Sequence, residues 1–299
     1  MNYDSPADIR AELERRGLTL KKRWGQNFLI NRGARERLIA LLDPRHGESV
    51  WEIGPGLGAM TELLLARGAR CTVFEVDRGL CRFLAEEYVR PGRLVLVSGD
   101  FLETWEGALQ AGPVPSLVIG NLPYRSASLM ITALIDGELR ARRMVFTVQK
   151  ELAERMSSDP GKKSYSSFSV LCQAAFEVKE EGDLRPGSFY PAPDVVSTVV
   201  ALRPRADAPS GAVLEMLQVL LRGLFASRRK TLRNNAGAAR LPQGVTAEIL
   251  LEALEWSGAA PGSRAEEHSP EVFVRAARSL AGAMPGAQQS GDPRRSSSP

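Results

Sequence analysis

The chain has 299 residues, 43% hydrophobic and 25% charged, which is typical of a soluble globular protein with one sizeable core and a smaller second domain. Its formal net charge of +4 fits a nucleic-acid partner without requiring one. Three widely spaced cysteines and two histidines argue against a disulfide framework, a zinc site and a Ser-His-Asp triad. No signal peptide or membrane-spanning run is apparent, so we expect a reduced, cytoplasmic protein.

The first two thirds of the chain alternate between helical and strand patterns. Residues 1–20 are interpreted as a short polar helix or arm, and the basic patch Lys21-Lys22-Arg23 follows. Apolar spacing predicts helices over 32–42, 59–66 and 80–88, and strands over 49–53, 71–75, 94–97, 116–120, 144–148, 176–180 and 195–202. This alternation predicts an α/β fold with a parallel, doubly wound sheet.

The composition changes after Arg203, where a linker rich in Pro, Ala and Ser begins. Helical spacing beyond it predicts helices over 213–240, 246–256 and 270–281, and Ser269-Pro270 is a good start signal for the last one. We therefore predict four parts: an N-terminal arm at 1–20, an α/β domain at 21–204, a small all-helical domain at 205–283 and a disordered polar tail at 284–299.

Three predicted strand ends carry residues suited to an adenosine-containing cofactor. Glycines at 54, 56 and 58, in the turn EIGPGLG, let the backbone approach a ligand closely. Glu75 ends the next strand, where a carboxylate accepts both hydrogen bonds from a ribose diol. Asp100 follows the third strand and is placed either to accept an adenine amino group or to cap a helix. The turn and Glu75 alone do not separate a nicotinamide dinucleotide from S-adenosylmethionine.

The tetrapeptide Asn121-Leu122-Pro123-Tyr124, after the fourth strand, indicates the reaction. An exocyclic adenine amine is a poor nucleophile because its lone pair is delocalised into the ring. The side-chain oxygen of Asn121 and the main-chain carbonyl of Pro123 would accept its hydrogens, and Tyr124 would stack on the base. The nitrogen would then attack a sulfonium methyl in line, with positioning and electrostatics in place of a strong base. We therefore predict Asn121, Pro123 and Tyr124 as catalytic residues.

These motifs, in this order, resemble the bacterial small-subunit ribosomal RNA adenine dimethyltransferase (KsgA) family. The resemblance covers roughly residues 20 to 280. Its matching segments are GQNFL at 25–29, EIGPGLG at 52–58, Glu75, Asp100, NLPY at 121–124, QKE at 149–151 with Glu154-Arg155, FYPAPDVVS at 189–197, Phe225, SRRK at 227–230, Leu232 and Arg233.

The resemblance implies a Rossmann-like sheet of the methyltransferase type with a small C-terminal all-helical domain that binds RNA. It also implies an S-adenosylmethionine site without a metal, lined by Asn27, Leu29, Gly54, Glu75, Asp100 and Asn121. The implied activity is dimethylation of N6 of two adjacent adenosines near the 3′ end of 16S rRNA, in the 30S subunit or its precursor. We expect a cytoplasmic monomer that acts in ribosome biogenesis.

A basic segment of the predicted helical domain is the candidate RNA-binding surface. We expect Arg228, Arg229 and Lys230 to lie on a helix, and the resemblance favours phosphate contacts over a solvated face. The patch at 21–23 is a second candidate. Residues 125–128 and 166–168 depart from the family's usual Asn-Ile and Gly-Arg-Leu, which concerns contacts to RNA or base.

Three alternative functions remain open from the sequence. The first is a 23S rRNA adenine methyltransferase of the antibiotic-resistance type, which shares the methyl-transfer core. The second, a nicotinamide-dependent oxidoreductase, would use the same glycine turn but leaves NLPY without a role. The third is a non-catalytic ribosome-assembly factor, against which the intact Asn27, Glu75, Asp100 and NLPY argue.

Overall fold

The structure, a computed structural model, describes residues 1–20 and 24–282. They form two compact units. Unit 1 consists of Met1–Ser157 and Phe176–Arg205, and unit 2 of Ser158–Ala175 and the chain from Ala206 onward. No helix of this described part is long and apolar enough to cross a membrane. The basic patch at 21–23 and the tail predicted from 284 lie outside the described residues.

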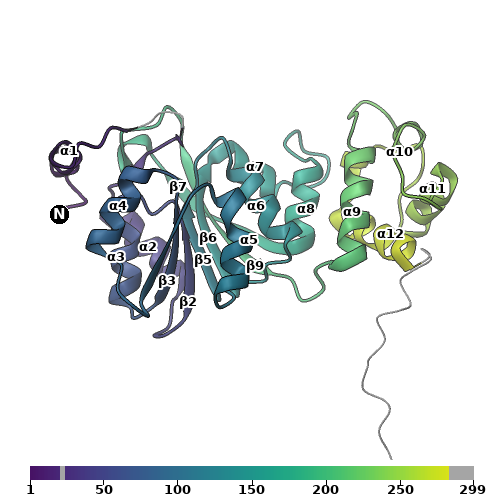
Figure 1. The fold of residues 1–299 in the computed structure, drawn as a ribbon. Helices are drawn as coiled ribbons and strands as arrows, with labels where there is room; N and C mark the ends of the chain where they lie inside the picture. The colour runs from purple at the N-terminus through teal and green to yellow at the C-terminus, as the bar shows by residue number, and fades with distance from the viewer. Residues whose placement is uncertain (21–23, 283–299) are drawn as a thin grey trace, which may run out of the picture. The chain divides into compact units, whose positions relative to one another are not determined.

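Unit 1 is built around a seven-stranded sheet with the order β4-β3-β2-β5-β6-β9-β7 (Figure 1). The strands are β2 (Ser49–Ile53), β3 (Arg70–Glu75), β4 (Leu94–Ser98), β5 (Leu117–Asn121), β6 (Arg143–Gln149), β7 (Phe176–Leu184) and β9 (Ser197–Pro204). The strands from β4 to β6 run parallel, whereas β9 pairs antiparallel with both β6 and β7. A separate short ribbon pairs β1 (Phe28–Leu29) with β8 (Phe189–Tyr190).

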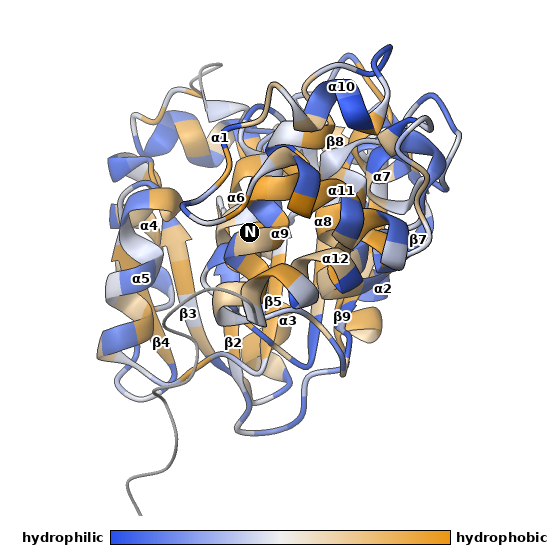
Figure 2. Cartoon of the chain, turned by 90° about the vertical axis from the view of Figure 1, so that its right-hand side faces the viewer, coloured by the Kyte–Doolittle hydropathy of each residue, from blue (hydrophilic) through white to orange (hydrophobic). Residues whose placement is uncertain are grey.

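Helices cover both faces of this sheet (Figure 1). They are α2 (Arg32–Leu42), α3 (Ala59–Ala66), α4 (Arg78–Glu87), α5 (Phe101–Ala111), α6 (Ala127–Asp136) and α7 (Lys150–Ser157). Helix α1 (Pro6–Arg15) packs on α4 instead, and Pro186–Ser188 form the 3₁₀ turn η2. Val50 of β2 packs in the core with α2 and α3. Its neighbour Trp51 points the other way and meets Phe74 edge-on, and Phe74 meets Phe101 at the start of α5. Both faces of the central strands are therefore buried, which explains their nearly continuous apolar runs (Figure 2).

Unit 2 is helical, and an aromatic cluster ties its two chain segments together. Its elements are α8 (Ser167–Ala175), α9 (Gly211–Leu224), α10 (Leu232–Ala236), α11 (Ala247–Trp256), η3 (Ala265–Glu267) and α12 (Pro270–Gly282). The ring of Phe225 lies 6.2 Å from that of Tyr165 and 5.5 Å from that of Phe273. The Tyr165 hydroxyl also donates to the His268 carbonyl at 2.8 Å. These contacts group residues 158–175 with the helical unit, although we expected them in the α/β domain at 21–204.

The predicted fold class, a Rossmann-like α/β sheet with an all-helical second part, is confirmed. The strand at 49–53 and the helices at 32–42 and 59–66 agree residue for residue, and α12 begins at Pro270 as its start signal predicts. The strands at the β7–β9 edge are antiparallel and so depart from a purely parallel sheet. The continuous helix predicted over 213–240 is wrong, because α9 and α10 are separate helices.

Candidate active site

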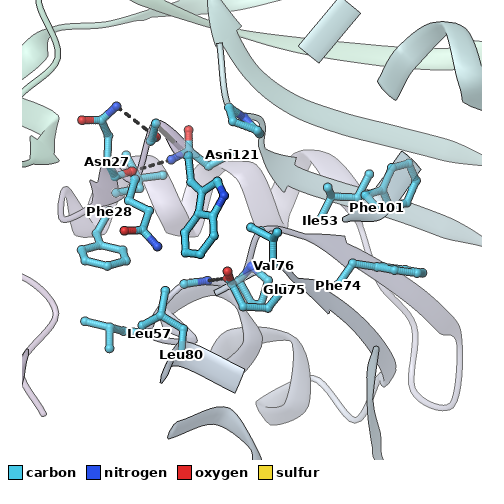
Figure 3. Close-up of a pocket in the computed structure, with 18 of the residues that line it drawn as sticks. Asn27, Phe28, Ile53, Leu57, Phe74, Glu75, Val76, Leu80, Phe101 and Asn121 are labelled. Carbon is cyan, nitrogen blue, oxygen red and sulfur yellow. Dashed lines mark hydrogen bonds between the residues drawn. The ribbon is translucent and has the colours of Figure 1, made fainter. Parts of the chain in front are cut away.

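A pocket of about 550 Å³ opens at the carboxyl-terminal edge of the sheet (Figure 3). All eight residues that the sequence assigns to cofactor binding or catalysis line it: Asn27, Leu29, Gly54, Glu75, Asp100, Asn121, Pro123 and Tyr124. Most of them follow β2, β3, β4 and β5, which are neighbours in the sheet. Ligands of open α/β sheets bind outside the carboxyl ends of the strands, so this is the expected position for a cofactor.

The glycine turn after β2 brings bare backbone to the pocket. Gly54 and Gly56 have φ angles of 71° and 60°, in the left-handed region that glycine adopts without steric cost. The Gly54 N–H donates to the Phe74 carbonyl at 3.0 Å and so ties the turn to β3. A Cβ on Gly56 would come within 2.8 Å of the Phe28 ring. A side chain here would therefore displace a pocket wall.

Glu75 ends β3 and is only 5% exposed. Its Oε2 accepts a hydrogen bond from the Gly56 N–H at 3.2 Å (Figure 3), and its Oε1 accepts one from the Asp77 N–H at 2.9 Å. Burial raises the pKa of Glu75 to about 7, against these backbone hydrogen bonds, which lower it. The pocket wall therefore holds an oriented carboxylate whose charge changes near neutral pH.

Asp100 lies at the start of α5 and lines the pocket. Its Oδ1 accepts a hydrogen bond from the Leu102 N–H at 2.9 Å, which is the helix cap considered from the sequence. No described residue donates to its Oδ2. Asp100 therefore caps α5 and still presents an acceptor to a ligand.

The tetrapeptide after β5 is fixed by contacts at both ends. Asn121 Nδ2 donates to the Asn27 carbonyl at 2.7 Å (Figure 3), and the Tyr124 hydroxyl shares a hydrogen bond of 2.7 Å with Ser197 Oγ. Burial raises the pKa of Tyr124, although the bond to Ser197 lowers it, so the phenol is neutral at physiological pH. The side chains of Asn121 and Tyr124 are thus held in place before any ligand binds.

Part of the pocket wall comes from the N-terminal segment, which the sequence did not assign to the site. Tyr3, Ile9 and Trp24 line the pocket. Ile9 and Leu13 of α1 pack with Leu57 of the glycine turn, and the Tyr3 hydroxyl donates to the Leu57 carbonyl at 3.1 Å. The i, i+4 spacing of Ile9 and Leu13 is the signal that distinguishes a packed helix from a solvated arm.

The segment predicted to bind RNA belongs to unit 2. Arg228–Lys230 form a turn between α9 and α10, so the prediction that they lie on a helix is wrong. The buried side chain of Asn235 explains the break, because its Nδ2 donates to the carbonyls of Leu224 at 2.7 Å and Ser227 at 3.0 Å. The Leu224 carbonyl, at the last residue of α9, would otherwise be left unpaired.

The three basic side chains of this turn differ in their surroundings. Arg228 donates to the Lys163 carbonyl and lies 3.4 Å from the carboxylate of Glu266. Arg229 and Lys230 are exposed, and no described residue pairs with either side chain. Arg228 therefore supports the structure of unit 2, while Arg229 and Lys230 are available to an anionic partner.

The sheet order and the position of this pocket define unit 1 as a Rossmann-like methyltransferase domain. The family model described as "Ribosomal RNA adenine dimethylase" matches residues 17–255. A relative from Treponema denticola, "Ribosomal RNA small subunit methyltransferase A", is 39% identical over 267 residues, which cover 89% of this chain and 91% of the relative. The chain therefore belongs to the ribosomal RNA adenine dimethylase family.

Two solved structures are also similar. A dimethyladenosine transferase from Plasmodium falciparum superposes with a TM-score of 0.68 at 23% identity and covers 84% of this chain and 97% of its own, a likeness of fold alone. The 23S rRNA methyltransferase ErmE superposes with a TM-score of 0.62 at 25% identity, over 85% of this chain and 99% of its own. No group of three His, Cys, Asp or Glu side chains within 1–20 and 24–282 could hold a metal ion.

Proposed function

We propose that this chain is an S-adenosylmethionine-dependent dimethyltransferase that modifies N6 of two adjacent adenosines near the 3′ end of 16S rRNA. Its substrate would be the 30S subunit or a late precursor of it. Family membership and the 39% identity to a small-subunit methyltransferase support this reading. The single observation that carries the chemistry is the orientation of the Asn121 amide in the pocket.

The contact between Asn121 and Asn27 decides which atom faces the substrate. Because Nδ2 of Asn121 donates to the Asn27 carbonyl, its Oδ1 is left to accept a hydrogen from an adenine amine. The carbonyl of Asn27 cannot turn away freely, since the Asn27 side chain donates to the Gly25 carbonyl at 3.3 Å. Asn121 therefore holds and polarises the target nitrogen without removing a proton in advance.

The second acceptor for the amine comes from the main chain. The Pro123 carbonyl, expected from the sequence, already accepts the N–H groups of Ser126 at 3.1 Å and Ala127 at 2.9 Å. No described residue donates to the neighbouring Leu122 carbonyl. The hydrogen-bond pattern thus favours Leu122 as the acceptor, with Pro123 fixing the turn that presents it.

Tyr124 gives the target base a surface to stack on. Its ring lines the pocket, and the bond from its hydroxyl to Ser197 Oγ fixes the ring's orientation. A fixed aromatic ring retains a flipped base at little entropic cost.

The residues on the other side of the pocket fit an adenosine-containing cofactor. Backbone at Gly54 and Gly56 allows close approach, Glu75 is oriented to accept from a ribose diol, and Asp100 Oδ2 accepts from an adenine amino group. S-Adenosylmethionine would supply the methyl group as an activated sulfonium. Phe101 and Val76 give this side of the pocket apolar walls.

The alternatives are less well supported. An oxidoreductase gives the Asn121–Tyr124 segment no role, and the family match is to adenine dimethylases. The 23S rRNA methyltransferase ErmE shares the fold but has 25% identity, against 39% for the small-subunit relative. A non-catalytic assembly factor would have no need of the oriented Asn121 amide.

Methyl transfer to defined particles tests the proposal. The protein would be incubated with methyl-labelled S-adenosylmethionine and under-methylated small subunits, with under-methylated large subunits in parallel. We expect two dimethylated adenosines near the 3′ end of 16S rRNA and none in 23S rRNA. Label in 23S rRNA would favour the antibiotic-resistance type, and binding to small subunits without label would favour the assembly factor.

A further inference from the structure

The charged residues of the pocket are unevenly distributed. Among the described residues that line it, three are charged: Glu75, Asp100 and Arg125. Glu75 ends β3 and Asp100 follows β4, whereas Arg125 follows β5, beyond β2 in the strand order. Neighbouring strands lie about 4.8 Å apart, so roughly 10 Å separates β3 from β5. Within the described part of the chain, the pocket therefore has its carboxylates on one side and a single cation on the other.

Arg125 is held by its backbone but not by its side chain. It lies in the tight turn between β5 and α6 that the Ser126 and Ala127 N–H groups close on the Pro123 carbonyl. Its side chain is exposed, and no described residue forms an ion pair or a side-chain hydrogen bond with it. The rim of the pocket thus presents a cation with which no described residue pairs.

We propose that Arg125 binds the backbone phosphate next to the target adenosine when the base enters the pocket. This rests on the proposed function and names a contact that the substrate makes at the rim. A base that leaves its stack carries its ribose with it, but the flanking phosphates stay outside because they continue the chain. A guanidinium on the rim matches the two oxygens of such a phosphate.

The adjacent residue strengthens this assignment. Tyr124 faces the pocket where the base would stack, so the turn offers a ring for the base and a cation for its phosphate in consecutive residues. The competing anion is the carboxylate of the cofactor. Arg125 adjoins Tyr124 and lies two strands away from Glu75, which we assign to the cofactor. Its place on the base side of the pocket favours the phosphate.

The test compares Arg125→Gln and Arg125→Lys with a matched charge-removing control, Arg70→Gln. Arg70 is also exposed but begins β3, at the sheet edge opposite the pocket. Binding to under-methylated small subunits would be measured across salt concentrations, and S-adenosylhomocysteine affinity by calorimetry. We expect Arg125→Gln to lower the log–log salt slope by about 0.7–0.9 and to weaken subunit binding about tenfold. Arg125→Lys should keep the slope and lose part of the affinity, and Arg70→Gln should behave as wild type.

Each other outcome has a definite meaning. An unchanged salt slope and subunit affinity in Arg125→Gln would overturn the proposal. Weaker S-adenosylhomocysteine binding with an unchanged slope would assign Arg125 to the cofactor carboxylate, which also overturns it. If wild-type protein binds subunits but transfers no methyl group, the proposed function fails, while the difference between Arg125→Gln and Arg70→Gln still decides the phosphate contact.

Discussion

Glu75 is a buried carboxylate in the pocket wall, where we propose that it binds the ribose of the cofactor. Burial raises its pKa to about 7 from the ordinary 4.5, so a substantial fraction is protonated below neutral pH. A ribose diol donates two hydrogen bonds and is best matched by the ionised form. We therefore expect the affinity for S-adenosylhomocysteine to increase as the pH rises from 6 to 8, measured by calorimetry.

A variant separates this effect from titration of the ligand itself. Glu75→Gln stays uncharged at every pH, so its affinity should be lower at pH 8 by about 1–3 kcal/mol, the range for a polar group left badly paired. Any pH dependence that it keeps belongs to the ligand or to other groups. Equal pH profiles for Glu75→Gln and wild type would remove Glu75 from the cofactor site.

In the proposed function Asn121 and Tyr124 contact the methyl acceptor, so their substitution should affect transfer more than cofactor binding. We expect Asn121→Ala to slow single-turnover methylation of under-methylated small subunits by about 10²–10³-fold, as for one lost preorganised polar group. Tyr124→Ala should lose about 1–3 kcal/mol of stacking. Tyr124→Phe keeps the ring and should retain most activity, although it loses the bond to Ser197. A wild-type rate in Asn121→Ala would contradict the amine-binding role.

At the scale of elements, the sequence predicts those helix and strand boundaries that nearby residues determine. An apolar run followed by a glycine turn predicts β2, and the Ser-Pro pair predicts the start of α12. Both signals act within a few residues. One continuous helix was expected over 213–240 because arginine and lysine are good helix formers. The chain breaks there because the Asn235 side chain folds back onto the carbonyls at the end of α9, a contact that local propensity does not reveal. The helices α5 to α8 were not predicted at all.

In the pocket too, residues placed by the strand pattern were predicted, and residues placed by long-range contacts were not. Glu75, Asp100 and Asn121 were predicted together because the carboxyl ends of neighbouring parallel strands share one edge of the sheet. Tyr3 was missed because its partner Leu57 lies 54 residues away, and nothing local in the sequence announces that contact. Pocket residues that are placed by long-range packing therefore could not be predicted from the sequence.

A substitution in helix α1 tests the part of the pocket wall that the N-terminal segment forms. Ile9 is 1% exposed and lines the pocket, so Ile9→Ala should leave a cavity and lower the free energy of unfolding by about 2–4 kcal/mol. It should also weaken S-adenosylhomocysteine binding, since the wall that carries Tyr3 would loosen. Glu14→Ala, on the exposed side of α1, is the control for both denaturation and calorimetry and should match wild type. If Ile9→Ala loses stability but binds the ligand normally, α1 supports the fold without shaping the site.

At the scale of the whole molecule, the pocket and the exposed basic pair Arg229 and Lys230 belong to different units. Every residue that lines the pocket belongs to unit 1, whereas Arg229 and Lys230 belong to unit 2. If these two side chains neutralise phosphates, Arg229→Gln with Lys230→Gln should lower the log–log salt slope of subunit binding by about 1.4–1.8, twice the value for one contact. S-Adenosylhomocysteine affinity should not change.

Arg228 offers an internal comparison in the same turn. Because it is tied to the Lys163 carbonyl and to Glu266, Arg228→Gln should destabilise unit 2 and alter the salt slope less than loss of either exposed neighbour. Thermal unfolding would report the first effect and subunit binding across salt concentrations the second. A double variant of Arg229 and Lys230 with the wild-type slope would identify the turn as a solvated surface. Phosphate contacts would then be sought in unit 1, where Arg125 provides an exposed cation at the pocket rim.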